Sequence, residues 1–289
     1  MHPLKFVEAA AIRAVQMEGV TLGRPVCQDR LFAFQESARL VLGIAAVPGF
    51  SALITTQFAE AGTKASVEAL GKKYSRRLPS ISAVDSARIV RLTEKHMANI
   101  VSTRSPLQRR QLEDSTRVLD QLIMRCGEYV HGMFEGLLKT MCVQAWGTIE
   151  VLFEDLLTNV IEAYPVYFPQ IDKEKLYFRK LDGTRKWYGR AFQHDLKIDA
   201  ILNGEKLSAL AEVRHILVHR GGAVDDDFKK AAAKIPAIAK FASYDEGRKL
   251  QFDGEMIFRL VDPAFTEVYS LITEVNRWLS DQKTPAPTP

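Results

Sequence analysis

The sequence predicts a mainly α-helical protein, a helical bundle with one short β-hairpin near its C-terminus. Two observations support this fold class. Apolar residues recur at helical spacing through most of the chain, and glycine and proline interrupt them where helices usually end. The hairpin is expected where the runs 248–252 and 255–260 flank Asp253-Gly254, a dipeptide suited to a type I′ turn.

The first 125 residues are expected to form a helical, basic region of unassigned role. Helices are predicted over about 4–18, 28–47, 64–76 and 82–101, and Pro48-Gly49 should stop the second. This region contains 18 Lys and Arg against 11 Asp and Glu, whereas the remainder contains 21 against 24. The excess suggests a polyanionic partner, or else a solvated basic surface.

The second part of the chain, 126–282, carries the strongest helical signal. From 107 to 163 the pattern hardly pauses, and Gly127, Gly132 and Gly136 are the expected places for a break or kink. The stretch 130–161 has a wide apolar face. Further helices are predicted over 205–219, closed by Gly221-Gly222, and over about 263–279, before a disordered tail at 283–289.

Composition places the chain among globular proteins. Hydrophobic residues make up 47% and charged residues 26%. No run reaches 18 consecutive apolar residues, so we expect no spanning helix and no membrane partner. The N-terminus lacks the pattern of a secretory signal, and the three cysteines lack CxxC spacing. These features predict a cytoplasmic protein.

Two arginines and two histidines lie within seven residues at the end of the 205–219 helix: Arg214, His215, His219 and Arg220. Cations in the last turn of a helix, followed by glycine, are typical of a helix cap, and His219 and Arg220 fit that interpretation. Arg214 fits it less well. Its helix is apolar around it, so the guanidinium needs a partner anion or a function.

A metal site is the second interpretation of this cluster. Glu212, His215 and His219 share one helical face, as in the Glu-x-x-His stripes of helix-bundle metal sites. Such sites need matching carboxylates from other helices, and no second stripe is present in the sequence. We therefore predict no metal and no other cofactor. The sequence also lacks a GxxxxGKS phosphate loop and a GxSxG nucleophile motif.

The third interpretation is a resemblance. RHILVH, residues 214–219, resembles the R-x(4–6)-H motif of HEPN domains, in particular the RiboL-PSP-HEPN branch. The upstream segment AWGTIEVLFEDLL, residues 145–157, is similar to the first long helix of those proteins. The glycine pair, the acidic residues 225–227, the expected hairpin and the closing helix follow the order of that branch. The resemblance covers roughly residues 126–282.

The resemblance implies an α-helical bundle, usually dimeric, in which two motif helices form a composite site. Many HEPN proteins are metal-independent endoribonucleases of toxin–antitoxin or phage-defence systems, and others are inactive nucleotide-binding or scaffolding domains. It therefore implies RNA as substrate, a homodimer, and an antitoxin or defence protein as a further partner. The alternative is a catalytically inactive HEPN-like module that binds nucleic acid, a nucleotide or another protein.

The residue types suit RNA cleavage by 2′-OH attack. His219 can act as general acid and base, Arg214 can hold the phosphoryl oxygens, and His215 can assist on the face of His219. On an ideal helix Arg214 and His219 diverge by roughly 140°. This divergence favours a site completed by a second chain.

An aromatic and basic insert, residues 177–195, is expected to be rich in loops. Cations interleaved with aromatics suit phosphates and unpaired bases. The alternative, which we favour, is a surface loop whose aromatics pin it to the bundle. The candidate RNA-binding residues are Arg185, Lys186, Trp187, Tyr188, Arg190 and the motif residue Arg220.

Overall fold

The computed structural model describes residues 1–12, 20–70, 83–103, 109–178 and 180–282. This part of the chain contains ten α-helices and no β-strand, so the mainly α-helical class is confirmed. The helices are α1 (Phe6–Ala9), α2 (Pro25–Leu70), α3 (Ala83–Thr103), α4 (Arg109–Ile123), α5 (Glu128–Ala163), α6 (Leu181–Ala191), α7 (Leu196–Leu202), α8 (Glu205–Arg220), α9 (Asp226–Ala232) and α10 (Gly254–Asp281).

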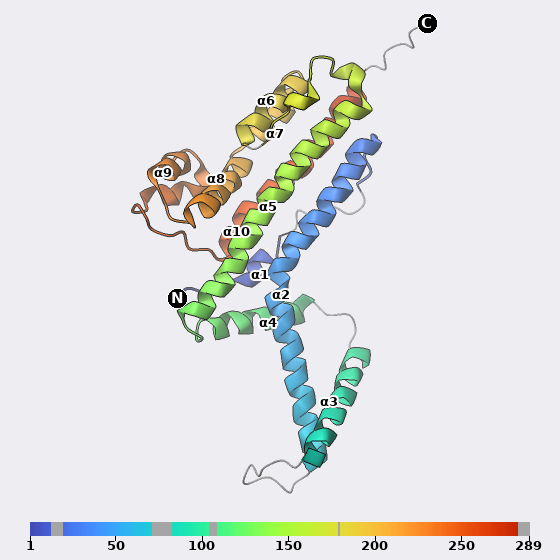
Figure 1. Ribbon diagram of the computed structural model, residues 1–289, viewed down its shortest axis with the longest axis vertical. Helices are drawn as coiled ribbons and strands as arrows, with labels where there is room; N and C mark the ends of the chain where they lie inside the picture. The colour runs from blue at the N-terminus through green and yellow to red at the C-terminus, as the bar shows by residue number, and fades with distance from the viewer. Residues whose placement is uncertain (13–19, 71–82, 104–108, 179, 283–289) are drawn as a thin grey trace.

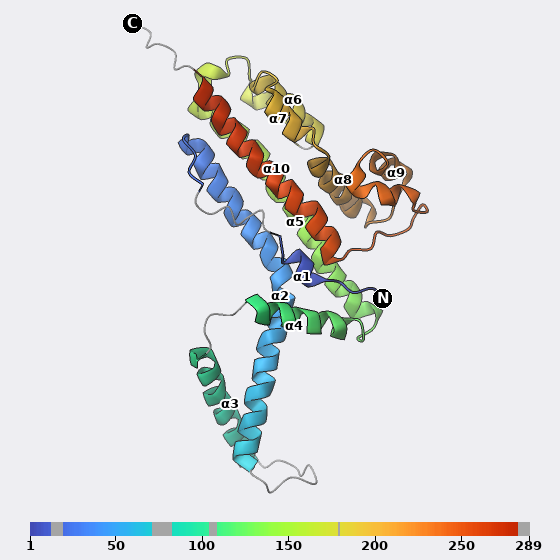
Figure 2. The same cartoon turned by 180° about the vertical axis from the view of Figure 1, so that it is seen from behind.

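Three long helices form the centre of the molecule. The first half of α2 runs beside α5 and α10, and α6 to α9 lie on the other side of the α5–α10 pair (Figure 1; Figure 2 shows the same from behind). The second half of α2 extends away from this bundle with α3 against it, and α4 crosses α2 between the two parts. The elongated shape follows from the 46 residues of α2, which span about 70 Å at 1.5 Å per residue.

The hydrophobic core is continuous across the predicted boundary at residues 125 and 126. Leu31 and Phe34 of α2 are buried in the same cluster as Ile149 of α5 and Phe265 of α10. The Phe34 and Phe265 rings meet edge to face with centroids 5.2 Å apart. The N-terminal region therefore supplies one side of the core of the 126–282 region.

The strongest predicted helix, 130–161, lies within α5. It begins after Gly127, whose φ of 90° suits glycine, and ends at Tyr164 before Pro165. The expected break occurs at Gly127, between α4 and α5, and α5 continues through Gly132 and Gly136.

The predicted hairpin at Asp253-Gly254 is wrong, because these residues begin α10. The Asp253 carboxylate accepts a hydrogen bond from Met256 N at 2.8 Å, as an N-cap does. Gly254 N donates to Leu4 O at 2.6 Å, and a Cβ on Gly254 would lie 1.8 Å from Lys5 O. The glycine is needed for the close approach of the N-terminal segment. Residues 255–260 are helical, and α10 continues through Pro263.

The expected stop at Pro48-Gly49 is also wrong, because α2 continues through both residues. A Cβ on Gly49 would lie 1.9 Å from Thr116 Oγ1 of α4. Gly49 therefore allows α4 to cross α2 in close contact, and the dipeptide marks a helix crossing. Within the described part of the first predicted helix, 4–18, only α1 is helical. Residues 13–18 of that helix, residues 71–76 of the predicted helix 64–76, and the tail 283–289 lie outside the described residues.

In length and composition α2 qualifies as a membrane-spanning helix, contrary to expectation. One 18-residue window of α2 has a mean hydropathy of 1.7, and 33% of that window is buried in the molecule. Glycine, proline and threonine interrupt its apolar runs without adding charge, which is why counting consecutive apolar residues missed it. A helix in a protein core passes the same test.

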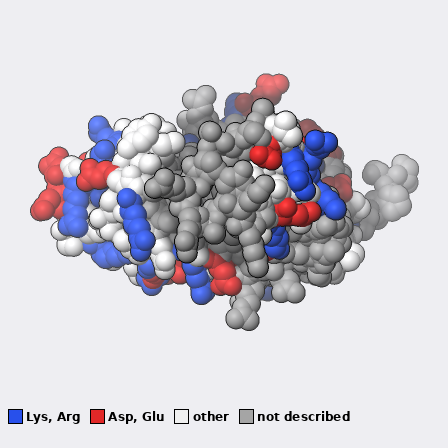
Figure 3. Space-filling model, turned by 90° about the horizontal axis from the view of Figure 1, so that it is seen from below, with Lys and Arg blue, Asp and Glu red and all other residues white. Residues whose placement is uncertain are grey.

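Viewed from the α2–α3 end, the described Lys and Arg side chains lie among Asp and Glu side chains, and those visible on this face form no single basic patch (Figure 3). On α3, Arg88, Arg91 and Lys95 are exposed at positions three and four residues apart.

A buried carboxylate of α4 holds the N-terminal segment. Asp120 accepts a hydrogen bond from Phe6 N at 3.2 Å through Oδ2, while its Oδ1 is buried without a partner in the described part of the chain. The pKa of Asp120 is raised to about 6, mainly by burial and also by nearby Glu8, although the hydrogen bond from Phe6 N lowers it.

The α2–α4 crossing predicts a steric coupling between two positions. Gly49→Ala should destabilise the protein by about 1–3 kcal/mol, because the new methyl group overlaps Thr116 Oγ1. In the double variant Gly49→Ala/Thr116→Ala, part of this loss should be recovered. Urea unfolding of the two single variants and the double variant measures the coupling, and strictly additive losses would contradict it.

Asp120 predicts a pH dependence of stability. Its folded pKa of about 6 exceeds the ordinary value of 3.8, so between these pH values the folded state holds a proton that the unfolded state has released. Asp120 therefore reduces stability as pH rises from 4 to 6, by up to about 1.4 kcal/mol per unit. Asp120→Asn should remove this dependence and be more stable than wild type above pH 6. Asp114→Asn, an exposed site on α4, is the control in urea unfolding from pH 4 to 8.

Candidate functional site

Helix α8 positions the predicted motif. It begins after Gly204 and ends at Gly221, whose φ is 60° and whose N–H donates to Ile216 O. Leu210, Val213 and Ile216 are buried, and α8 packs against α5 and α10. This packing leaves Arg214 half-buried beside α5, and His215 and His219 exposed.

A cleft of about 500 Å³ lies beside Arg214, where α5, α6 and α8 meet the end of α9. Its polar lining contains four cations, three carboxylates, a serine and a histidine. The polar lining residues are Glu150, Lys180, Asp182, Arg185, Ser208, Glu212, Arg214, His215 and Lys234. The structure therefore brings together three of the predicted site residues, Arg185, Arg214 and His215.

Arg214 has incomplete partners in this cleft. Its Nη2 lies 3.8 Å from Glu150 Oε2, which is a long ion pair, and 28% of its side chain is exposed. Its Nε is buried and has no hydrogen-bond partner among the described residues. A guanidinium has five N–H donors, so Arg214 retains the capacity to bind an anion in the cleft.

Arg185 is held more firmly. Its Nε donates to Leu202 O at 2.9 Å, Nη2 donates to Ser208 Oγ at 2.8 Å, and Nη1 donates to Asp182 Oδ1 at 2.9 Å. These bonds join α6 to α7 and α8. Arg185 is therefore a brace of the cleft wall that also contributes positive charge.

The two histidines of the motif are in ring contact, and only His215 lines the cleft. The rings of His215 and His219 lie one helical turn apart, with centroids at 4.6 Å. Beyond them Arg220 Nε donates to Asp225 Oδ2 at 3.2 Å. The pKa of Asp225 is lowered, first by the hydrogen bond from Phe228 N and then by the charges of Arg220 and His215. His219 and Arg220 are outside the cleft lining, so the motif is divided between the cleft and the helix end.

The insert is helical where loops were expected, because α6 occupies 181–191. Tyr188 is fully buried and donates a hydrogen bond to Phe153 O at 2.9 Å, so it cannot stack on a base in this structure. Trp187 is partly buried, with Lys186 and Arg190 over its ring at 5.8 and 5.4 Å. Lys186 and Arg190 are exposed and are not part of the cleft lining.

Several cleft residues escaped the sequence analysis. Glu150 and Trp146 lie one turn apart on α5, and Lys180 and Lys234 come from the segments before α6 and after α9. The i, i+4 spacing of Trp146 and Glu150 indicates a shared helical face. Nothing in the sequence indicates which helix this face meets.

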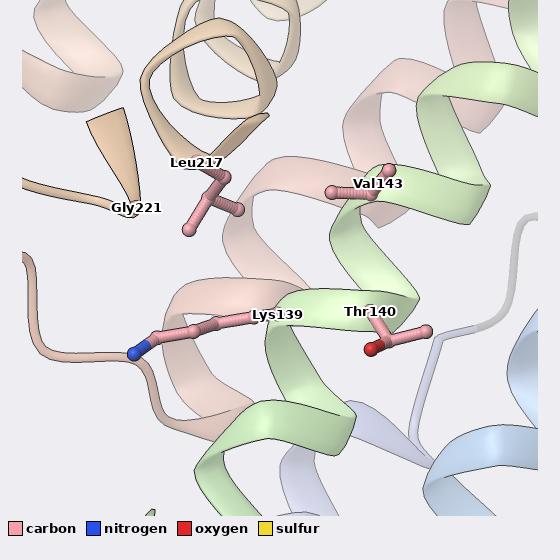
Figure 4. Close-up of a pocket in the computed structure, with 5 residues that line it drawn as sticks. All are labelled: Lys139, Thr140, Val143, Leu217 and Gly221. Atoms are coloured by element: carbon pink, nitrogen blue, oxygen red, sulfur yellow. The ribbon is translucent and has the colours of Figure 1, made fainter. Parts of the chain in front are cut away.

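Among the described residues, no group of three or more His, Cys, Asp and Glu side chains is placed to hold a metal ion. A smaller pocket between α5 and the end of α8 is lined by Lys139, Thr140, Val143, Leu217 and Gly221 (Figure 4). Its one cation, Lys139, is paired with Glu135 at 2.8 Å.

Compared with known proteins, the chain matches no family model, no curated protein and no solved structure.

Proposed function

We propose that the cleft between α5, α6 and α8 binds RNA, and that the protein is a metal-independent endoribonuclease of HEPN type. One observation carries the proposal: the His215–His219 pair extends from a cleft that contains Arg185 and the incompletely paired Arg214. Arg214, His215 and His219 thus lie on neighbouring turns of α8, and Arg185 lines the same cleft from α6. The resemblance of residues 214–219 to the R-x(4–6)-H motif agrees with this arrangement.

The chemistry needs a base, an acid and a fixed cation. One histidine takes the 2′-OH proton, the 2′-oxygen attacks the adjacent phosphorus, and the 5′-oxygen leaves with a proton from the other histidine. Arg214 balances the charge that develops on the phosphoryl oxygens. The products carry a 2′,3′-cyclic phosphate and a 5′-OH.

A binding module without catalysis is the second candidate function. It is favoured by the ion pair of Arg214 with Glu150 and by the three carboxylates of the cleft, which reduce its positive charge. Such a module would use the same cleft to bind nucleic acid, a nucleotide or another protein without turnover. The association of two chains near α8, the antitoxin or defence partner and the cytoplasmic location stay predictions.

His219 should be required for cleavage. We expect His219→Ala to reduce RNA turnover about 10² to 10⁴-fold while leaving the thermal unfolding midpoint unchanged, since His219 is exposed. His96→Ala on α3, which is outside the cleft lining, is the control and should keep full activity. The assay incubates purified protein with single-stranded and structured RNA in EDTA and analyses the product ends. Cleavage that persists in His219→Ala, or that needs a divalent ion, would contradict the mechanism.

Glu150 should weaken RNA binding by neutralising Arg214. Glu150→Gln keeps the shape of the side chain and removes its charge, so RNA affinity should rise about fivefold, the factor that roughly 1 kcal/mol provides. Glu154→Gln, an exposed site one turn further along α5, is the control. Affinity is measured in the His219→Ala background to prevent cleavage. An unchanged or lower affinity would place the RNA outside this cleft.

A further inference from the structure

Helix α2 has two apolar faces, and between residues 32 and 58 the rest of the described chain covers only one of them. Phe34, Ala38 and Ala45 are buried on the side that packs against α5 and α10. On the opposite side, six large apolar side chains are between 37% and 77% exposed. We call them the α2 stripe: Phe32, Leu40, Val47, Phe50, Ile54 and Phe58.

The α2 stripe has the geometry of a helix-packing seam. At 100° per residue its members fall within an arc of about 80°, and it extends for about 40 Å. Leu40, Val47 and Ile54 are seven residues apart, which is the repeat that keeps one line of side chains facing a partner helix. The segment from residue 40 to residue 59 contains no charged residue.

Beyond Ile54, helix α3 of the same chain covers the same face of α2. Ala61, seven residues after Ile54, is fully buried, as is Ala65, and α3 packs against this part of α2. His96 of α3 also hydrogen-bonds Glu68 of α2 at 2.9 Å. The α2 stripe thus ends where α3 begins, so a helix is the element that this face accommodates.

We propose that the α2 stripe binds the α2 stripe of a second copy of this chain, with the two helices antiparallel about a two-fold axis near Val47. Leu40 and Ile54 are equally distant from Val47 along the helix, so each lies opposite the other in the second copy. Phe50 falls opposite Ile44 of the second copy, next to Gly43. The space around a Cβ on Gly43 is open, with no atom within 4 Å, so the aromatic ring fits there. The surface is complementary to itself, as a two-fold dimer requires.

The charges near the stripe favour a protein partner over a bilayer. Glu36 lies in the line of the stripe with 73% of its side chain exposed, and it pairs with Arg39 at 3.0 Å. A carboxylate on this line opposes burial in hydrocarbon, whereas at the rim of a helix pair it keeps both its partner and water.

This dimer is independent of the proposed function. The stripe residues lie on the face of α2 opposite to the residues that are buried against α5 and α10. Helices α2 and α8 lie on opposite sides of the α5–α10 pair (Figures 1 and 2), and the cleft is lined by residues of α5, α6 and α8. The two copies would therefore present two clefts pointing outward. A dimer formed at α8, as predicted from the sequence, would instead bring the clefts together.

Sedimentation of the full chain tests the proposal. At about 50 µM the wild type should be a dimer, and Val47→Asp should weaken it at least tenfold. The far-UV circular dichroism of the variant should stay that of the wild type, because Val47 is exposed. Val166→Asp, at an equally exposed valine, is the control and should stay dimeric. A monomeric wild type, or a dimer that Val47→Asp does not weaken, would overturn the proposal.

Cross-linking fixes the position of the contact. In a Cys126→Ser background, which removes the exposed native cysteine, Val47→Cys should form an intermolecular disulfide with diamide as oxidant, and Val166→Cys should not. Cross-linking through His219→Cys but not Val47→Cys would place the interface at α8 and overturn the proposal. Val47-dependent binding of a monomeric wild type to phosphatidylcholine/phosphatidylglycerol vesicles would overturn it in favour of a bilayer. RNA cleavage enters none of these readouts.

Discussion

The burial of α5 is the constraint on which the rest of the structure depends. Between Leu138 and Ile161, the α5 side chains that face α2, α8 and α10 are buried. A helix that is apolar on most of its circumference needs cover from several directions, and no single neighbour provides it. The N-terminal α2, the motif helix α8 and the C-terminal α10 are therefore held around one element. Trp146 and Glu150 of α5 line the cleft beside α8.

The N-terminal segment adds a second constraint, which is made by backbone contacts. Leu4 O accepts the hydrogen bond of Gly254 N, and His2 O accepts one from His131 Nε2 at 2.7 Å. Lys5, held at a φ of 52°, forms an ion pair with Glu255 in the first turn of α10. The first residues thus join the beginnings of α5 and α10. The buried Asp120 carboxylate fixes the same segment from α4 and makes this junction sensitive to pH.

The sequence predicted the structure best where a local pattern of residues determines the local structure. The periodic apolar face of 130–161 and the glycines after α8 gave correct helices and a correct end. Asp253-Gly254 and Pro48-Gly49 misled because their glycines serve a close approach by a distant segment: Lys5 at Gly254 and Thr116 at Gly49. Such approaches leave no local pattern. The prediction of a loop-rich insert was wrong for a related reason. The ring of Tyr188 packs in the core and its hydroxyl donates a hydrogen bond to Phe153 O, and both contacts are made by distant residues.

The same limit applies to the site. The motif at 214–219 was visible because its residues are neighbours in the chain, and helix geometry alone places His215 beside His219. Glu150 could not be recognised from the sequence as the partner of Arg214, because the packing of α5 against α8 creates that pair.

The Arg214–Glu150 pair affects the electrostatic balance of the cleft, whose lining contains four cations and three carboxylates. A polyanion that enters must draw Arg214 away from Glu150, so binding there includes the cost of breaking an ion pair. Because the pair is long and half-exposed, that cost is about 1 kcal/mol or less, and a single phosphate held by Arg214 repays it.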